Sequence, residues 1–233
     1  MSEALHDFAT RVEDDLLPTF CGDPARRYAL DGFDKRSIKV TSQDARNFMR
    51  AIASNVVADT GGGRFRAAQS KAHEVIFWEG SRSKTPRRIT LWMEPVITIA
   101  SLALLHFEYR WPKHLLGMQS EKWEFDLTAF TPDNMRCEHI AGEVKKSASE
   151  LATLLKNMMA LQSEGAIDES TLTRIQRNAY RKCRGLLRRR APLFWAVSPG
   201  AVSQLFSVSY PTAETLILNE ISLERLEFPP SSL

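Results

Sequence analysis

The stretch HIAGEVKKS, residues 139–147, decides how the rest of the chain is interpreted. A short apolar run leads to Glu143, and Lys145 follows two residues later. Because successive side chains of a strand alternate between its two faces, Glu143 and Lys145 point to one face and Val144 points to the other. A strand with a buried pattern therefore ends with a carboxylate and an ammonium group on the same side.

A second acidic residue stands in the strand-like segment WEFDLTAF, residues 123–130. Asp126 has apolar neighbours there, and the turn TPDN (131–134) can join this segment to the next one as a hairpin. Such a hairpin brings Asp126 beside Glu143, where two buried carboxylates repel each other and lose hydration. A hard divalent cation, Mg²⁺ or Mn²⁺, suits an oxygen cage of this kind. Lys145 is then placed to orient or deprotonate a water molecule, or to stabilise charge on a phosphate.

A third acidic residue, Glu94, lies upstream in ITLWMEPVITIASLALLHFEY, residues 89–109. This segment contains a helix that is apolar on nearly every face, so we expect it to be buried, with Pro95 in its first turn. If the helix packs on the sheet, Glu94 can reach the same cation. Two simpler interpretations stay open: the helix dipole favours an acid at this position, and Glu143 and Lys145 could form an exposed ion pair at a solvated strand end.

The pattern around these segments predicts an α/β domain. Helices are expected from the cap Ser147 to Leu161, and from Asp168 or Ser170 to about Arg190. The expected strands are residues 114–119, 122–130, 136–145, 193–197, 204–210 and 216–221. With the helix of residues 89–109 in front, the order is α-β-β-β-α-(α)-β, which indicates a mixed central β-sheet flanked by helices.

The N-terminal part is predicted to be an α/β accessory region. We expect a surface helix over residues 3–17, a short strand at 38–40, a helix from about 41 to 58, and strands near Phe65 and at 73–78. The basic loop GSRSKTPRR, residues 80–88, follows and marks a candidate boundary. The predicted division is therefore residues 1–88 for the accessory region and 89–233 for the domain that carries the acidic residues.

The second predicted helix of that domain is strongly basic. Residues 174–190, RIQRNAYRKCRGLLRRR, contain eight Lys and Arg residues and no acid. A spacing of three and four gathers five arginines on one stripe: Arg174, Arg177, Arg181, Arg184 and Arg188. Such a stripe suits the phosphate backbone of a nucleic acid, although a merely solvated helix face would have the same pattern.

Composition excludes several other classes of protein. The 233 residues are 43% hydrophobic and 25% charged, with a net charge of +3, as in an ordinary globular protein. Three distant cysteines argue against a disulfide framework or a cysteine-based zinc site. The longest apolar stretch, 95–107, is shorter than the roughly 20 residues of a membrane span, and the acidic N-terminus is unlike a signal peptide. We therefore expect a cytoplasmic protein without a membrane partner.

Glu94, Asp126 and Glu143-x-Lys145, placed on a helix and two strands in that order, resemble the PD-(D/E)xK nuclease superfamily. The resemblance covers about residues 89–200 and departs from the family pattern at Phe125, which stands where the name has proline. It implies a restriction-endonuclease-like core. It also implies that Asp126 and Glu143 are metal ligands, Glu94 an accessory ligand and Lys145 the catalytic lysine.

The expected function is that of a metal-dependent nuclease, a hydrolase that uses Mg²⁺ or Mn²⁺ to cut phosphodiester bonds. DNA is favoured over RNA because most of the family cuts DNA, which is an analogy. An endonuclease is one form of this activity, and the mode of cutting stays open. The alternative is an inactive nuclease-like module that binds nucleic acid or a protein partner, and a homodimer is also left open.

Overall fold

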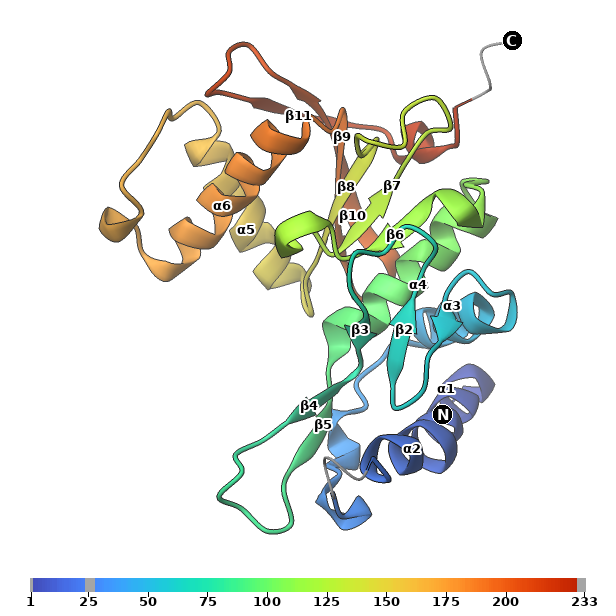
Figure 1. Ribbon diagram of the computed structural model, residues 1–233. Helices are drawn as coiled ribbons and strands as arrows, with labels where there is room; N and C mark the ends of the chain where they lie inside the picture. Colours follow the sequence, from blue (N-terminus) through green and yellow to red (C-terminus); the bar gives the residue numbers. More distant parts are fainter. Residues whose placement is uncertain (1, 24–27, 230–233) are drawn as a thin grey trace.

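The computed structural model describes residues 2–23 and 28–229 (Figure 1). Its α-helices are α1 (Glu3–Thr10), α2 (Leu17–Cys21), α3 (Ser42–Ala53), α4 (Met93–Phe107), α5 (Ala148–Leu161) and α6 (Arg174–Arg189), and a π-helix, Arg11–Leu16, joins α1 to α2. Its strands are β1 (Ala58–Asp59), β2 (Arg64–Arg66), β3 (Glu74–Val75), β4 (Phe77–Glu79), β5 (Ile89–Leu91), β6 (Leu116–Met118), β7 (Leu127–Ala129), β8 (Ile140–Val144), β9 (Leu193–Ser198), β10 (Val202–Ser209) and β11 (Ile217–Ile221).

A six-stranded mixed sheet forms the centre of the molecule, in the order β11-β10-β9-β8-β7-β6. The neighbours β8 and β9 are parallel, and every other pair in this sheet is antiparallel. The parallel pair requires a crossover, which α5 and α6 supply between the two strands. The prediction of a mixed α/β sheet flanked by helices is confirmed.

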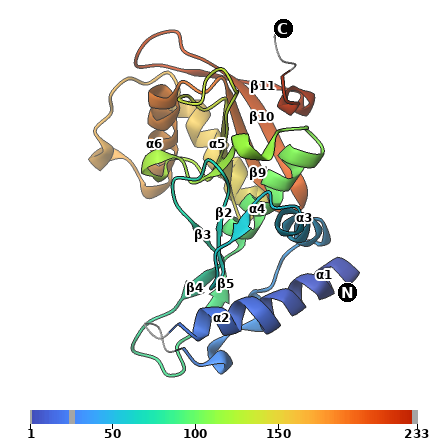
Figure 2. The same cartoon turned by 45° about the vertical axis from the view of Figure 1, so that its right-hand side comes forward.

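Helices cover both faces of this sheet (Figures 1 and 2). Ile140, Val144 and Trp195 belong to the apolar cluster that contains the buried residues of α4. Ala141 and Phe194, which alternate with them, belong to the cluster beneath α5 and α6. Because Glu143 follows the alternation of Ala141, its side chain lies on the α5–α6 side.

Helix α4 is the central buried helix, as its sequence predicts. Ten of its residues are buried, from Pro95 to Leu105. It packs against α3 on one side and contacts β6, β8 and β9 on the other. Its N-terminus, with Glu94, consequently comes close to the end of β8 where Glu143 lies.

Gly142 allows β7 and β8 to pack closely beside the acidic residues. A Cβ atom at this position would lie 2.3 Å from Cδ1 of Leu127, the residue that faces it across the two strands. Any other residue would displace the side chain of Leu127.

The N-terminal part combines α1, α2 and α3 with a three-stranded antiparallel sheet, β1-β2-β3. The separate antiparallel pair β4–β5 follows and extends away from the central sheet (Figure 1). This hairpin crosses the expected boundary at residues 88 and 89, and buried residues from both sides of it share one apolar cluster. The division into two domains stays a prediction.

Three local expectations were wrong. Residues 122–130 do not form one strand: Glu121–Trp123 is a 3₁₀ turn and only Leu127–Ala129 forms β7, so Asp126 lies just before the strand. Residues 38–40 form no strand, because they run between the 3₁₀ turn Lys35–Ser37 and α3, and Val40 is buried by packing rather than by strand pairing. The basic helix begins at Arg174, where Thr173 provides a capping box with Gln176. Asp168 caps only a short 3₁₀ turn, Glu169–Thr171.

Candidate active site

The candidate site lies at the end of β8, where the two helical layers meet at the sheet. Leu127 pairs with Gly142 in the antiparallel register of β7 and β8, and the backbone N–H of Asp126, the residue before β7, donates a hydrogen bond to the carbonyl of Gly142. Asp126 therefore lies beside the end of β8, where the charge of Glu143 acts on its carboxyl group. The backbone N–H of Val144 donates a hydrogen bond of 2.8 Å to Oδ2 of Asp126. The sequence predicted that these two carboxylates lie side by side, and the structure brings Asp126 to the residue that follows Glu143.

Glu143 is the most deeply buried member of the group, with 1% of its surface exposed. Nζ of Lys145 donates a hydrogen bond of 2.6 Å to its Oε1. Nζ of Lys182, which comes from α6, is in ion-pair contact with its Oε2. Lys182 also donates to the carbonyl of Glu124 and lies 5.5 Å from the ring centre of Phe125.

Glu94 reaches the same group from α4. Its Oε1 lies 4.0 Å from Nζ of Lys145, and Nε1 of Trp92 donates a hydrogen bond of 3.3 Å to its Oε2. Glu94 therefore faces Lys145 from the other side of the sheet end, as the hypothesis of a shared site requires.

The N-terminal region contributes a fourth carboxyl group, that of Glu74 on β3. Glu74 is buried, and Nε2 of Gln119 donates a hydrogen bond of 2.6 Å to its Oε1. The backbone N–H of Gln119 donates in turn to the carbonyl of Asp126. Burial, together with the nearby charges of Asp126 and Glu94, raises the pKa of Glu74 to about 8.

These contacts set different charge states for the neighbouring groups. Burial, together with the charge of Glu143, raises the pKa of Asp126 to about 7. Burial alone would raise the pKa of Glu143 as well, but Lys182 and Lys145 hold it below its ordinary value. Burial opposes the charge of Lys145 too, yet Glu143 and Asp126 raise its pKa above the ordinary value for lysine. Lys145 is therefore an ammonium ion at neutral pH, which favours charge stabilisation over the role of a base.

The donors of this group suit a hard divalent cation in their chemistry. Four carboxyl groups (Glu74, Glu94, Asp126 and Glu143) and two lysines (Lys145 and Lys182) gather here, so full ionisation would leave a net charge of −2, which one divalent cation would balance. Oε2 of Glu143 accepts no well-aligned hydrogen bond from the described residues, although Lys182 is in contact with it. Within residues 2–23 and 28–229, no three acid, histidine or cysteine side chains stand in an arrangement ready to hold a metal.

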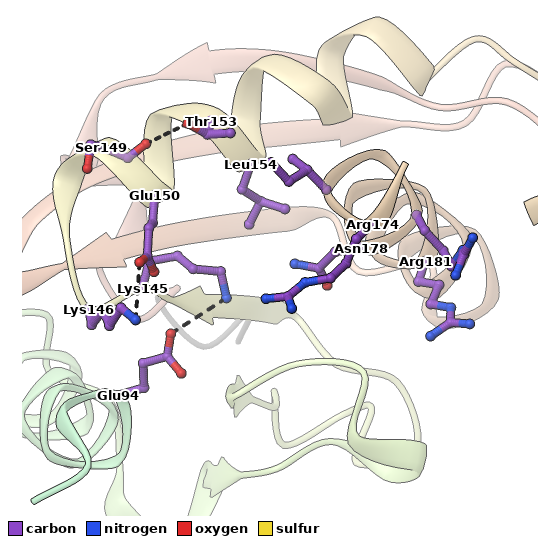
Figure 3. Close-up of a pocket in the computed structure, with 12 residues that line it drawn as sticks. Glu94, Lys145, Lys146, Ser149, Glu150, Thr153, Leu154, Arg174, Asn178 and Arg181 are labelled. Atoms are coloured by element: carbon purple, nitrogen blue, oxygen red, sulfur yellow. Dashed lines mark hydrogen bonds and ion pairs between the residues drawn. The ribbon is translucent and has the colours of Figure 1, made fainter. Parts of the chain in front are cut away.

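A cavity of about 770 Å³ opens beside this group, between α5 and α6 (Figure 3). Glu94 and Lys145 lie on one wall with Lys146 and Glu150, and residues of α6 lie on the opposite wall. Arg174, Arg177 and Arg181 are three of these, so the first half of the predicted arginine stripe faces the cavity.

The second half of the stripe is paired with acids elsewhere. Arg184 forms an ion pair of 2.6 Å with Glu214, and Arg188 forms one with Glu124. Even in the first half, Arg181 pairs with Glu169 at 2.8 Å. The stripe therefore exists as a helix face, but only part of it is available to a ligand of the cavity.

Sequence reasoning missed Glu74 and Lys182. Glu74 opens the apolar run EVIFW, so the same argument that singled out Glu94, a charge among apolar residues, applies to it. Lys182 is hidden in a run of basic residues. It reaches the site because α6 packs tightly on Phe125 at Gly185, where a Cβ atom would lie 3.1 Å from Cζ of that ring.

Comparison with family models, with curated proteins and with solved structures yields no match for this chain. Among the described residues, no helix has the length and apolar character needed to cross a membrane. Any assignment of function therefore depends on the residues of the site themselves.

The buried carboxyl group of Glu74 predicts a dependence of stability on pH. The pKa of Glu74 is about 8 in the folded protein and takes the ordinary value of 4.5 in the unfolded chain. The contribution of Glu74 to stability is therefore fully present below about pH 4.5 and is lost as pH rises towards 8. In chelator, the melting temperature should fall by several degrees between about pH 5 and pH 9, and Glu74→Gln should reduce this fall. Burial also raises the pKa values of Asp126 and Glu138 to about 7, so these two groups lower the melting temperature over the same pH range. Glu74→Gln retains both groups and should therefore keep part of the fall. The exposed Glu164→Gln serves as control, and an equal fall in wild type and Glu74→Gln would contradict the assignment.

Proposed function

We propose that the protein is a metal-dependent nuclease of the PD-(D/E)xK type, which hydrolyses phosphodiester bonds of nucleic acid, with DNA favoured. One observation carries the proposal: Asp126 is hydrogen-bonded to Val144 at the end of β8 and interacts with the charge of Glu143, and the ammonium group of Lys145 is hydrogen-bonded to Glu143 and near Glu94. The order α4, β6, β7, β8, α5 and β9 in the structure is compatible with a restriction-endonuclease-like core.

In this proposal the residues of the chain have separate roles. Asp126 and Glu143 would hold a Mg²⁺ or Mn²⁺ ion, and Glu94 would complete the acidic set. When bound, such an ion would supply an activated water molecule and neutralise charge on the phosphate. Lys145, fixed by Glu143 and the carbonyl of Val144, stabilises the negative charge that develops on the phosphate.

The walls of the cavity supply a path for the substrate. Lys146 and three arginines of α6 (Arg174, Arg177 and Arg181) line it with the acidic group at one side. Cations in such a groove bind phosphates and fix the orientation of the strand without selecting its sequence. Arg184 and Arg188, paired with Glu214 and Glu124, contribute less to binding in this proposal.

One contact favours the alternative, a nuclease-like module that binds nucleic acid or a partner protein without cutting. Both oxygens of Glu143 are in contact with lysine ammonium groups, so its charge is already balanced within the protein. A cation would have to compete with Lys182 for Oε2. The nuclease requires that a cation displaces Lys182 from this oxygen, whereas the binding module requires no cation there.

The test is cleavage of a small panel: duplex DNA, single-stranded DNA and RNA, each with Mg²⁺, with Mn²⁺ and with chelator. The expected result is fragments that require the metal and that vanish with chelator. Asp126→Asn, purified in the same way, should give no fragments and so excludes a contaminating nuclease. Binding of nucleic acid without cleavage in either metal would favour the module that only binds.

A further inference from the structure

Two exposed tryptophans lie side by side on the β4–β5 hairpin. Trp78 is 59% exposed and Trp92 is 41% exposed, and their ring centres are 5.9 Å apart in an edge-to-face arrangement. Trp78 pairs with Thr90 across the hairpin, and Trp92 follows Thr90 by two residues, so both indoles are on one face. Phe77 and Leu91, on the other face, are buried in the core. One face of the hairpin is therefore packed in the core, and the other exposes a pair of tryptophans to solvent.

The loop at the tip of this hairpin carries unpaired positive charge. Arg87 forms an ion pair with Glu79, and Arg88 forms one with Asp34. Arg82 and Lys84 are exposed, and neither side chain has an ion pair or hydrogen bond to the described residues. The tip of the hairpin therefore carries two unpaired basic side chains, Arg82 and Lys84, next to the tryptophan pair.

The aromatic face leads into the candidate active site. Nε1 of Trp92 donates a hydrogen bond to Glu94, and Glu94 lines the cavity together with Lys145. The hairpin extends from the start of α4 away from the central sheet in both views (Figures 1 and 2). A strand that leaves the cavity past Glu94 would meet Trp92 first and then Trp78.

We propose that the β4–β5 hairpin is a nucleic-acid-binding arm, on which unpaired bases stack against Trp78 and Trp92 while Arg82 and Lys84 contact phosphates. This inference rests on the proposed function and names its substrate class: nucleic acid with a single-stranded segment next to the site of cleavage. Exposed indoles beside free cations suit the binding of a single strand, because each unpaired base can stack on an aromatic ring while the cations contact the phosphates. Bases inside a continuous duplex present no face that can stack in this way.

The test measures affinity under conditions that prevent cleavage. Fluorescence anisotropy in chelator would compare a duplex, the same duplex with a single-stranded overhang, and the single strand alone. Wild type should bind the two substrates with unpaired bases more tightly than the duplex. Trp78→Ala should weaken that binding about tenfold and change duplex binding little, while Trp78→Phe, which keeps an aromatic face, should restore most of it.

A matched control and a second variant keep the test decisive. Trp123, 70% exposed on the 3₁₀ turn Glu121–Trp123, lies outside the hairpin, so Trp123→Ala should leave the preference for unpaired bases unchanged. The double change Arg82→Ala with Lys84→Ala removes no apolar contact and should reduce the salt dependence of binding to the overhang substrate. Equal affinity of wild type and both hairpin variants for all three substrates would overturn the proposal.

The outcomes also separate the arm from the enzyme. Preference for unpaired bases that depends on Trp78, without cleavage in any metal, would support the arm and reject the nuclease. Cleavage without such a preference would reject the arm alone. Loss of self-association or of protein binding in Trp78→Ala, with nucleic-acid affinity unchanged, would assign the aromatic face to a protein partner and overturn the arm.

Discussion

Lys145→Ala is expected to lower the rate of cleavage by about 10² or more, with little change in affinity for nucleic acid. The charges of Glu143 and Asp126 keep Lys145 an ammonium ion, so its removal eliminates a positive charge beside the phosphate without removing a carboxylate. Glu143 keeps its contact with Lys182, and the fold should therefore survive. Single-turnover rates in Mg²⁺ and binding constants in chelator measure the two effects separately.

Lys156→Ala is the matched control for this change, since Lys156 is an exposed lysine of α5 that does not line the cavity. It should leave both rate and affinity near the wild-type values. A loss of affinity in Lys145→Ala as large as its loss of rate would show that Lys145 acts in binding alone. A variant that cuts as fast as wild type would exclude Lys145 from the reaction.

The sequence predicted the part of the site that depends on local geometry. Alternation along one strand placed Glu143 and Lys145 on the same face, and a hairpin between adjacent segments placed Asp126 beside them. In the structure Asp126 accepts a hydrogen bond from the backbone of Val144, and Lys145 donates one to Glu143. Glu94 followed from a charge at the start of an apolar helix, and the structure has it 4.0 Å from Lys145.

The missed residues reach the site through contacts between distant parts of the chain. Glu74 arrives on β3 from the N-terminal region, joined to Asp126 through Gln119. Lys182 arrives on α6, whose position depends on its packing against Phe125. The sequence pattern within either segment cannot predict that Glu74 and Lys182 reach the site, because their positions depend on packing between distant parts of the chain.

The basic helix illustrates the same limit for charge. The spacing of three and four correctly predicts a stripe of arginines on one helix face, but it says nothing of the acids that surround this face. Glu124 and Glu214, which pair with Arg188 and Arg184, are far from them in sequence. The free positive charge of the stripe is therefore smaller than its composition indicates.

Removal of Asp126 and removal of Glu143 should change the stability of the protein in opposite directions, although both carboxylates are expected to be essential for cleavage. Asp126→Ala should abolish cleavage, because it removes a proposed metal ligand. In chelator at about pH 8 it should also raise the melting temperature by a few degrees, since it relieves the burial and repulsion that raise the pKa of Asp126 to about 7. Glu143→Ala should abolish cleavage and destabilise the protein by about 3–5 kcal/mol, because it leaves Lys145 and Lys182 partly buried without their shared carboxylate.

Whether the alanine variant is more or less stable than wild type identifies what each carboxylate does in the absence of metal. Glu143 neutralises two lysines and so stabilises the fold, whereas the burial of Asp126 beside Glu143 carries a cost that Lys182, Lys145 and the N–H of Val144 offset only in part. In the proposed function a bound cation would offset the rest. Asp126→Asn, which can still accept the hydrogen bond from Val144, should show the gain in stability most clearly. Adding Mg²⁺ should then raise the melting temperature of wild type but not that of either Asp126 variant. Equal destabilisation by Asp126→Ala and Glu143→Ala, with no effect of Mg²⁺ on wild type, would make Asp126 a structural carboxylate and remove the basis for a metal at this site.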